Sequence, residues 1–350
     1  MQPRIESLIR SAWKSVISYS YHHDHAVQAK AILKSIEGAK GRLSRSVVKE
    51  CDGYAIDVLG HRHFAGWLYV YSAVAGGFKE GWIPDNYYGS VVVPKLKGHY
   101  GMVSALKPLH STVFSHDSFP DILSYSSGLF FDTESRVLAP NSIKDRLFAG
   151  QDRVVFKLND SSRGRGIFFF DKESFRLNEI FKLGNGLFQA FISQHEIFQE
   201  FGKGSVATLR MTTAMGDEGT TSLRACYLRL GTGTDTHVQS KSHVRIPIDM
   251  KSGAFNNYGF TTDWLEIDCH PTSRVKFQGR SIPAYDDCVK IVTNLHKRVP
   301  YVRCIGWDLA VDDRQKVRIM EWNARHNDIK FSEATQGPCF SDLHWERLKG

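Results

Sequence analysis

Apolar residues recur at helical spacing from residue 4 to about residue 40. Between residues 4 and 40 this spacing is carried by Ile5, Leu8, Ile9, Trp13 and Val16, and then by the stretch 26–36. Residues 50–80 mix apolar and aromatic residues without strand-like alternation, and we interpret them as helical too. The stretch 81–101 is rich in Pro, Gly and Asn, which predicts a connecting segment and a boundary near residue 100.

From about residue 152 the pattern changes to short runs rich in β-branched and aromatic residues. The predicted strands include RVVFKL, GIFFF, GLFQAFI, SVATLRMTTAM, SLRACYLRLG and HVRIPID. One late helix is predicted over AYDDCVKIVTNLHKRV, whose apolar side is formed by Cys288, Ile291, Val292 and Leu295. The fold class predicted from these patterns is α+β, preceded by a mainly helical N-terminal region.

Two acids stand inside late strand-like runs, where apolar residues are expected. CIGWDLAV and VRIMEWNA are joined by the polar link DDRQK and read as a β-hairpin. A turn centred between Arg314 and Gln315 would place Asp308 opposite Glu321, and Asn323 would share their face. The opposite face, directed into a core, would carry Trp307, Leu309, Met320 and Trp322.

Facing carboxylates repel each other, so the hairpin needs something that offsets their charge. A divalent cation would do so, because Mg²⁺ prefers hard oxygen ligands such as carboxylates. Asp308, Glu321 and the amide carbonyl of Asn323 are therefore candidate metal ligands. The alternative is a solvent-facing hairpin in which rotamers and water keep the acids apart.

A lysine and a glycine loop lie upstream, in RVVFKLNDSSRGRGIFFF. Lys157 ends the first strand, and Gly164 and Gly166 allow the loop to present N–H groups to phosphate oxygens. Arg163 and Arg165 add positive charge. The pattern is not a Walker A loop, because no GK[ST] follows. The alternative is an ordinary hairpin with a flexible basic tip.

The segment GLFQAFISQHE follows, in which an apolar strand ends in polar residues and Glu196. Its apolar flanks and backbone polar groups suit an adenine ring, and the carboxylate suits ribose hydroxyl groups. The alternative is an edge strand with a polar exit.

Composition narrows the classes of ligand. The net charge of +8 without a lysine-rich tail favours a small anionic substrate over nucleic acid or a membrane surface. The six cysteines contain no CxxC pair, which argues against zinc and a disulfide framework. The N-terminus lacks the apolar core of a signal peptide, and GWLYVYSAVAGGF is too short to span a bilayer. We expect a cytoplasmic protein without a transmembrane segment.

Taken in order, the strand lysine, glycine loop, hinge strand and D…E-x-N hairpin resemble the ATP-grasp superfamily over roughly residues 100–345. The branch that it resembles most is the sugar-transfer-associated ATP-grasp proteins, related to glutamate ligases. The resemblance implies two α+β subdomains that clasp ATP, with ATP and Mg²⁺ as cofactors. It divides the chain into a helical region 1–100, a small subdomain 101–186 with the glycine loop, and a large subdomain 187–350 with the metal site.

The resemblance also implies residue roles. Asp308, Glu321 and Asn323 would hold Mg²⁺ between the ATP phosphates. The ATP-binding set would consist of Lys107, Lys157, Arg163, Gly164, Gly166, Gln189, Ile192 and Glu196. Lys107 is our choice for an early lysine of the family, with Lys144 as the alternative.

The sequence departs from the family pattern in three places. Ile305-Gly306-Trp307 lacks the arginine that often precedes the metal aspartate in ligases, so Arg210 or Arg325 would have to supply that catalytic charge. Gln189 stands where many members have a glutamate near the adenine amino group. The first hundred residues look unlike the open α/β domain of many members and are a candidate for carrying specificity.

The acceptor side is less defined. LRLGTGTDTHVQSKSHVRIPID could bind a carboxylate or a sugar phosphate through Arg229, His237, Lys241, His243 and Arg245. A solvated hairpin with scattered charge is the alternative. His326 is a candidate base for an incoming amine.

The function implied by the resemblance is an ATP- and Mg²⁺-dependent carboxylate–amine ligase that forms an amide through an acyl phosphate. Its substrates would be a small carboxylate and an amine, with a sugar acid or a nucleotide- or lipid-linked sugar of cell-surface polysaccharide as one partner. The alternatives are a kinase-like phosphotransferase with a hydroxyl acceptor and a non-catalytic nucleotide-binding protein. Nucleic acid is not an expected partner.

Overall fold

The computed structural model describes residues 2–159, 166–202, 204–233 and 243–348, with side chains from residue 16 onward. It contains two compact units, each of which is described by itself. The first comprises residues 1–95, 263–265 and 328–350, and the second comprises 96–262 and 266–327. The expected N-terminal boundary at residue 100 lies close to this division. The last residues, from 328 on, pack with the N-terminal unit, whereas we had grouped them with the large subdomain.

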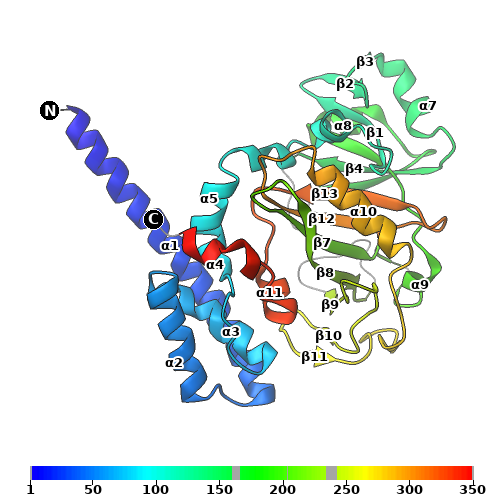
Figure 1. Cartoon of the computed structure of the whole chain (residues 1–350). Helices are drawn as coiled ribbons and strands as arrows, with labels where there is room; N and C mark the ends of the chain where they lie inside the picture. Colours follow the sequence, from blue (N-terminus) through cyan, green and yellow to red (C-terminus); the bar gives the residue numbers. More distant parts are fainter. Residues whose placement is uncertain (1, 160–165, 203, 234–242, 349–350) are drawn as a thin grey trace. The chain divides into compact units, whose positions relative to one another are not determined.

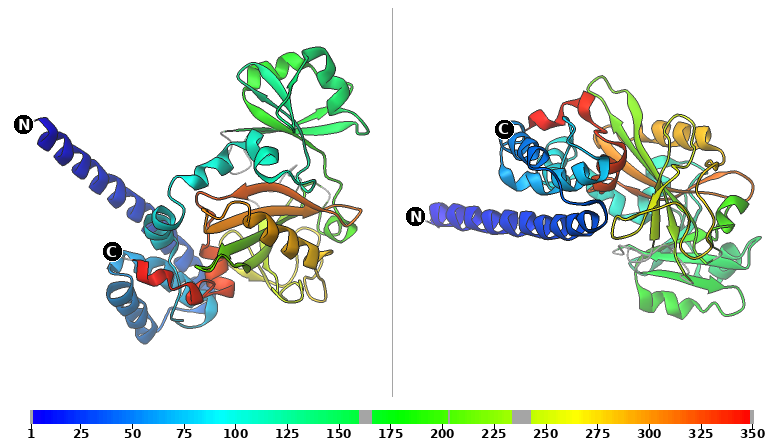
Figure 2. Two further views of the ribbon diagram at one scale, coloured as in Figure 1. Left: turned by 45° about the horizontal axis from the view of Figure 1, so that its top comes forward. Right: turned by 90° about the horizontal axis from the view of Figure 1, so that it is seen from below.

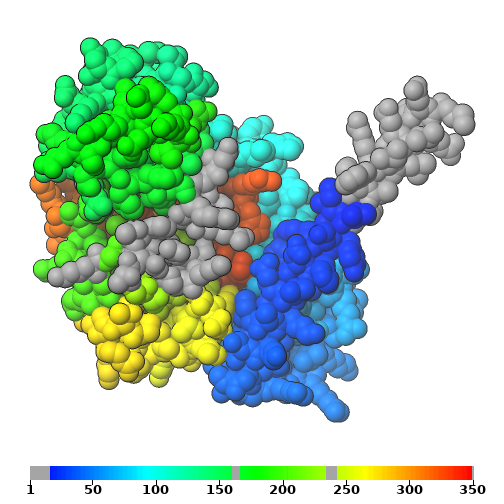
Figure 3. Space-filling view, turned by 180° about the vertical axis from the view of Figure 1, so that it is seen from behind, coloured from blue at the N-terminus to red at the C-terminus, as the bar shows by residue number. Residues whose placement is uncertain are grey.

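The N-terminal unit is helical, as the apolar spacing predicts. Its elements are α1 (Gln2–Lys40), α2 (Arg45–Gly53), η1 (Tyr54–Val58), η2 (Arg62–Phe64), α3 (Ala65–Ala75), α4 (Asp85–Tyr87), η3 (Tyr88–Val92), α11 (Lys330–Gln336), η7 (Ser341–Leu343) and η8 (Trp345–Leu348). The described part of α1 is drawn in blue in Figure 3. Val16, Ile17 and Tyr19 of this helix are exposed. Within the unit, the Glu333 carboxylate accepts hydrogen bonds from the backbone N–H groups of Ile83 and Cys339, at 2.9 and 2.8 Å.

The expectation of a connecting segment over 81–101 is wrong. This stretch forms α4, η3, α5 (Val93–Leu96) and the start of η4 (Tyr100–Ala105). Trp82, Ile83, Tyr87 and Tyr88 are fully buried. Pro84 precedes the first residue of α4, where a missing N–H costs nothing, so the proline starts a helix here and the aromatic residues fill a core.

The second unit contains a six-stranded antiparallel sheet. Its strands are β1 (Asp121–Ser126), β2 (Leu129–Asp132), β3 (Val137–Leu138), β4 (Arg153–Leu158), β5 (Ile167–Asp171) and β6 (Gly186–Ala190), in the order β3-β2-β1-β6-β4-β5. One face packs on α7 (Ile143–Leu147) and α8 (Leu177–Leu183) through a core that includes Phe156 and Phe188. The predicted β4–β5 hairpin is confirmed. Strand β6 belongs to this sheet, although we had placed 187–350 in the other subdomain.

The second sheet of this unit is seven-stranded and antiparallel. Its last two strands are orange in Figure 2. Its strands are β7 (Thr208–Met215), β8 (Thr221–Gly231), β9 (His243–Pro247), β10 (Gly259–Phe260), β11 (Glu266–Ile267), β12 (Cys304–Val311) and β13 (Val317–Asn323), in the order β11-β10-β9-β8-β7-β12-β13. Shorter helices are η5 (Lys107–Leu109), α6 (His110–Phe114), η6 (Pro140–Ser142) and α9 (Glu196–Gln199).

Alternation gives this larger sheet one apolar and one charged face. Helix α10 (Tyr285–His296) crosses the apolar face, as Figure 1 shows. Cys288, Val292 and Leu295 of α10 join the core, and Ile291 packs against it, as predicted for this helix. Trp307 and Leu309 on β12 point into the same core. Because paired residues share a face, the charged side chains between these core positions gather on the opposite side of the sheet.

The mixed architecture confirms the predicted α+β class and the helical N-terminal region. In the described part of the chain, no helix combines the length and apolar character that crossing a bilayer requires. Five of the six cysteines are buried and Cys269 is partly buried, and all six are free thiols.

Candidate functional site

The late hairpin is formed by β12 and β13, and its predicted register is confirmed at the acids. Asp308 pairs with Glu321 and Gly306 pairs with Asn323. A β-bulge then shifts the register, so that Leu309 pairs with Ile319. Met320 is the extra residue of the bulge.

The bulge corrects one expectation about the core. Met320 is only partly buried and lies outside the core, whereas Ile319 is fully buried within it. Trp307, Leu309 and Trp322 point into the core as predicted. The turn is therefore centred on Arg314, half a residue before the predicted centre between Arg314 and Gln315.

Two arginines from neighbouring strands neutralise Asp308. Arg210 on β7 donates from Nε and Nη2 to the two carboxylate oxygens, at 2.6 and 2.9 Å. Arg229 on β8 donates to Oδ1, and the amide of Asn323 donates to Oδ2 at 3.2 Å. Burial alone would raise the pKa of Asp308, but the two guanidinium groups outweigh burial and hold that pKa well below its usual range.

Arg210 lies beside Asp308, the predicted metal ligand, where the sequence has no arginine shortly before that residue. A Cβ atom on Gly306 would lie 2.8 Å from Cβ of Asn327 and 3.5 Å from Arg210, so this position has no room for a side chain. The charge comes instead from the next strand, because Asp308 pairs with Arg210 across β12 and β7. Arg325, the other candidate, is exposed, and its catalytic role stays a prediction.

Lys157, on β4 of the six-stranded sheet, contacts the β12–β13 hairpin of the other sheet. Its Nζ donates to the carbonyl oxygen of Met320 at 3.2 Å, next to Glu321. Burial lowers the pKa of Lys157, while the charges of Glu321 and Asp121 oppose that shift. Lys107 lies close enough to lower the same pKa further. Two cations and the two acids of the hairpin therefore share one region between the sheets.

The structure distinguishes the two candidates for the early lysine. Lys107 is 5% exposed and donates to the carbonyl oxygen of Asn159 at 3.1 Å, whereas Lys144 is exposed on α7. A solvated surface lysine at position 107 is therefore ruled out. Its contact with phosphate stays a prediction.

Buried Gln189 and partly buried Asp121 form a hydrogen-bonded pair that the sequence did not indicate. The Gln189 amide donates to Oδ1 of Asp121 at 2.7 Å across β6 and β1. Burial raises the pKa of Asp121 to about 6, against the opposing effects of Gln189 and Lys157. A carboxylate therefore lies beside Gln189, the predicted adenine contact. The only sequence signal was its place at the start of the run DILSYS, just after Pro120.

Lys97 is a second residue that the sequence did not reveal, because it lay in the presumed connecting segment. It is 1% exposed, and its Nζ donates to Oδ1 of Asn327 at 2.8 Å. The backbone oxygen of Asn327 accepts in turn from Nη1 of Arg210 at 3.0 Å. Lys97 thus supports the segment that holds Arg210 on Asp308.

Burial lowers the pKa of Lys97 to about 8. A lysine in an unfolded chain has a pKa near 10.4, so between about pH 8 and 10 the unfolded state holds more protons and stability rises with pH. Replacing Lys97 with methionine should remove this rise. Urea unfolding at pH 8 and 9.5 should show the difference in unfolding free energy between wild type and K97M changing by about 1–2 kcal/mol. The exposed Lys95 provides the control variant K95M, which should show no such change.

Several other predicted site residues either lie outside the described part of the chain or make no contact with the hairpin acids there. Arg163 and Gly164 lie outside the described residues, as do Arg165, His237 and Lys241. Gly166 has φ +79°, and its carbonyl oxygen accepts from the N–H of Leu158 at 2.9 Å, which closes the hairpin. His326 is exposed.

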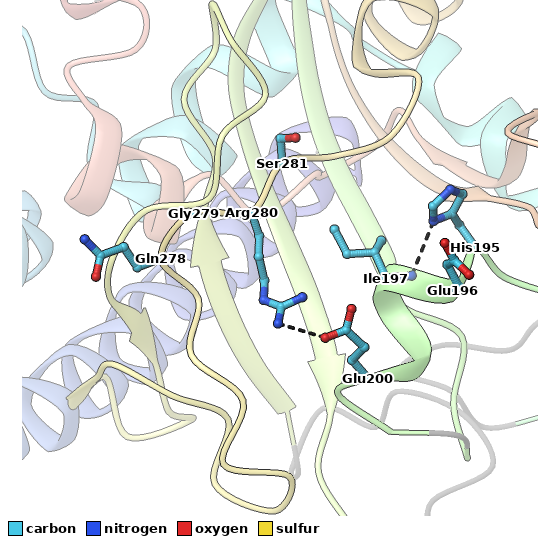
Figure 4. Close-up of a pocket in the computed structure, with 8 residues that line it drawn as sticks. All are labelled: His195, Glu196, Ile197, Glu200, Gln278, Gly279, Arg280 and Ser281. Atoms are coloured by element: carbon cyan, nitrogen blue, oxygen red, sulfur yellow. Dashed lines mark hydrogen bonds and ion pairs between the residues drawn. The ribbon is translucent and has the colours of Figure 1, made fainter.

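Glu196 lines a surface pocket of about 500 Å³ together with His195, Ile197, Glu200 and residues 278–281 (Figure 4). In this view Arg280 pairs with Glu200, at 2.8 Å. No contact joins Glu196 to Lys157 or Asp308 in the described part of the chain. The roles of Glu196 and of the partly buried Ile192 stay predictions.

The donor chemistry of the hairpin fits Mg²⁺. Asp308, Glu321 and Asn323 present oxygen atoms on one face, and Glu321 makes no ion pair with any described residue. A cation on Asp308 would have to replace at least one arginine contact. No cluster of three or more His, Cys, Asp or Glu suited to a metal occurs among residues that the structure describes.

The chain matches one family model and resembles several solved structures. The family model described as sugar-transfer associated ATP-grasp matches residues 141–343, which is more than half of the chain. No curated protein matches.

Several solved structures resemble parts of the chain. The biotin carboxylase domain of Hydrogenobacter thermophilus 2-oxoglutarate carboxylase, in complex with MgADP, ADP and bicarbonate, is 14% identical with a TM-score of 0.40, covering 73% of this chain and 46% of its own. Campylobacter jejuni biotin carboxylase is 11% identical with a TM-score of 0.45, covering 91% and 68%. The D-alanine-D-alanine ligase of Coxiella burnetii is 13% identical with a TM-score of 0.37, covering 70% and 58%. The chain thus spans about half the length of the first of these proteins.

Proposed function

The chain belongs to the sugar-transfer associated ATP-grasp family, and on that premise we propose that it is an ATP- and Mg²⁺-dependent ligase that joins a carboxylate to an amine. The observation that carries the proposal is the approach of Lys157 to Met320, 3.2 Å away on the strand of Glu321. It links the lysine of one sheet to the acids of the other. Phosphoryl transfer requires positively charged side chains and metal-binding acids to lie close together around the phosphates.

In this proposal the basic residues contact ATP, and the acidic and amide residues hold Mg²⁺. Lys157 and Lys107 offset the negative charge of the ATP phosphates, and Arg210 offsets the charge that develops on the transferred phosphoryl group. Asp308, Glu321 and Asn323 would hold Mg²⁺, which when bound draws charge from the phosphate oxygens. Gly166 closes the hairpin by accepting a hydrogen bond from the N–H of Leu158.

The reaction begins when a substrate carboxylate oxygen attacks the γ-phosphorus of ATP and ADP leaves. The product is an acyl phosphate, whose carbonyl carbon is a better electrophile than that of a carboxylate. The amine nitrogen then attacks this carbon, inorganic phosphate leaves, and the amine releases its proton to solvent or a base. His326 is exposed and could take that proton. The chain's main contribution is orientation and charge neutralisation.

The family description suggests substrates from sugar transfer. We infer that one partner is a sugar acid, free or linked to a nucleotide or lipid, and that the product serves cell-surface polysaccharide. A cytoplasmic location follows from the need for ATP. All six cysteines are free thiols and five of them are buried, which is compatible with a reducing compartment.

The proposal is tested by incubating the protein with ATP, Mg²⁺ and pairs of sugar acids and amino acids. Mass spectrometry should detect a condensed product that has lost one water, and phosphate release should require both partners. A product that retains phosphate would replace the ligase with a phosphotransferase. Absence of any ATP-dependent change with active-site-intact protein across acids, amines and hydroxyl acceptors would count for a non-catalytic nucleotide-binding protein.

A further inference from the structure

Three histidine rings, which we call the histidine stack, lie where helix α1 meets the rest of the N-terminal unit. His63 of η2 stacks on the other two rings, with centroids 3.7 Å from His22 of α1 and 3.8 Å from His61, the residue before η2. The planes of the His22 and His63 rings are 16° apart. Imidazole becomes positive on protonation near pH 6.5, so this contact between α1 and η2 consists of groups that acid can charge.

The hydrogen bonds of the histidine stack fit neutral rings. Nδ1 of His61 accepts from the backbone N–H of His63 at 3.1 Å, and Nδ1 of His22 faces the Asn86 amide nitrogen at 3.4 Å. Both partners can only donate, so both ring nitrogens are unprotonated. Nε2 of His63 is buried and has no hydrogen-bond partner among the residues that the structure describes. A second proton would therefore cost His22 or His61 a hydrogen bond, and a charged His63 would keep a buried N–H without an acceptor.

The charged groups around the histidine stack pair with one another rather than with its rings. On α4, Asp85 lies 3.9 Å from Nδ1 of His25 and 3.5 Å from Nζ of Lys330. Beside η2, Asp52 pairs with Arg62 at 3.1 Å. Within the described part of the chain, no carboxylate forms an ion pair with a ring of the stack, so nothing there offsets a charge that the stack acquires.

Burial and mutual repulsion both lower pKa values in the histidine stack. Burial first, and then the charges of His22 and His61, lower the pKa of His63 to about 4. Burial also lowers the pKa of His22, with His61 as the second cause. Tyr21, edge-on to His22 at 5.3 Å, stays neutral because burial raises its pKa. A histidine in an open chain has a pKa near 6.5, so below that pH the open state binds more protons and acid favours it.

We propose that the histidine stack is an acid-sensitive latch, which holds α1 against η2 and α3 at neutral pH and releases it when the rings become charged. Below the stack, α1 packs closely on α3, because a Cβ atom on Gly66 would lie 3.5 Å from Cβ of Ala29. Ala29 and Ile36 of α1 are each 1% exposed, so release uncovers apolar surface. The latch lies within the N-terminal unit and does not depend on the proposed ligase activity.

Amide hydrogen exchange of the full chain at pH 7.5 and pH 5.0 tests the latch, with rates corrected for the effect of pH on unprotected amides. A pKa that rises from about 4 to 6.5 on opening would make the open state about thirtyfold more populated at pH 5.0. Solvent around the partly buried His63 reduces this effect, so we expect a rise of about tenfold. Peptides from residues 20–36 should show it, because an undocked helix is only marginally stable in water.

Two variants and a matched control connect the exchange to the latch. H63F keeps an aromatic ring but cannot take a proton, so its acid response should be at least threefold smaller than that of wild type. H23F makes the same change at an exposed histidine of α1 and should respond like wild type. A29C/G66C places two thiols at a Cβ separation that suits a disulfide. Its oxidised form should lose the acid response, and reduction should restore it.

Equal protection of residues 20–36 at both pH values in wild type would overturn the latch. So would an acid response of H63F as large as that of wild type, or one that persists in oxidised A29C/G66C. Helix α10, which belongs to the other compact unit, should keep its protection at pH 5.0. If it lost protection together with α1, acid would be unfolding the whole chain, which contradicts a latch. If H63F is not protected like wild type at pH 7.5, the oxidised and reduced forms of A29C/G66C decide alone.

Discussion

Replacing Glu321 with glutamine is expected to lower kcat/KM for ATP at least a hundredfold while the protein keeps its stability. Asp308 is already neutralised by two arginines, whereas Glu321 makes no ion pair with any described residue. Glu321 therefore supplies the carboxylate most able to bind a cation. Loss of one preorganised electrostatic group from an active site typically costs about 10²–10³ in rate, and we expect loss of a charged Mg²⁺ ligand to cost at least as much. Steady-state kinetics across a range of Mg²⁺ concentrations provides the measurement.

Stability separates this effect from misfolding. Glu321 directly faces Asp308, so removing one negative charge relieves repulsion, and urea unfolding should change by no more than about 0.5 kcal/mol. Asp313, exposed in the turn of the same hairpin, provides the control variant D313N, which should keep full activity. Wild-type turnover by E321Q would show that the hairpin does not hold the metal.

The β12–β13 hairpin shows which features of the site can be predicted from the sequence and which cannot. Alternation along a strand fixes which residues share a face, so the pairing of Asp308 with Glu321 followed from a plausible turn. The bulge at Met320 did not, because one extra residue in a strand leaves no signature in the apolar pattern when a flexible methionine occupies it. Its carbonyl is the one that Lys157 contacts.

Contacts between distant segments were harder to predict. Arg210 was a candidate because of its charge, but its bidentate contact with Asp308 depends on the register between β7 and β12, which lie almost a hundred residues apart. Lys97 was missed because proline and glycine around it suggested a loop, whereas the aromatic residues of that stretch fill a core. Turn-forming residues mark the ends of helices as well as loops.

Replacing Lys157 with methionine is expected to weaken ATP binding by about 10- to 100-fold. Methionine has similar volume and removes the charge, and hydrogen bonds between charged groups contribute about 1.5–3 kcal/mol each. Calorimetric titration with AMP-PNP and Mg²⁺ measures the loss. Lys144, exposed on α7, provides the matched control K144M, which should bind like wild type.

The same variant makes a prediction that requires no ligand. The charge of Lys157 lowers the pKa of Asp121, which burial raises to about 6. Without Lys157 that pKa should rise further, so Asp121 would stay protonated to higher pH. NMR titration of the Asp121 carboxyl carbon in wild type and K157M detects the shift, and K144M should show none. If K157M binds nucleotide with wild-type affinity while the Asp121 pKa still rises, the lysine lies beside the acids as described but does not contact ATP.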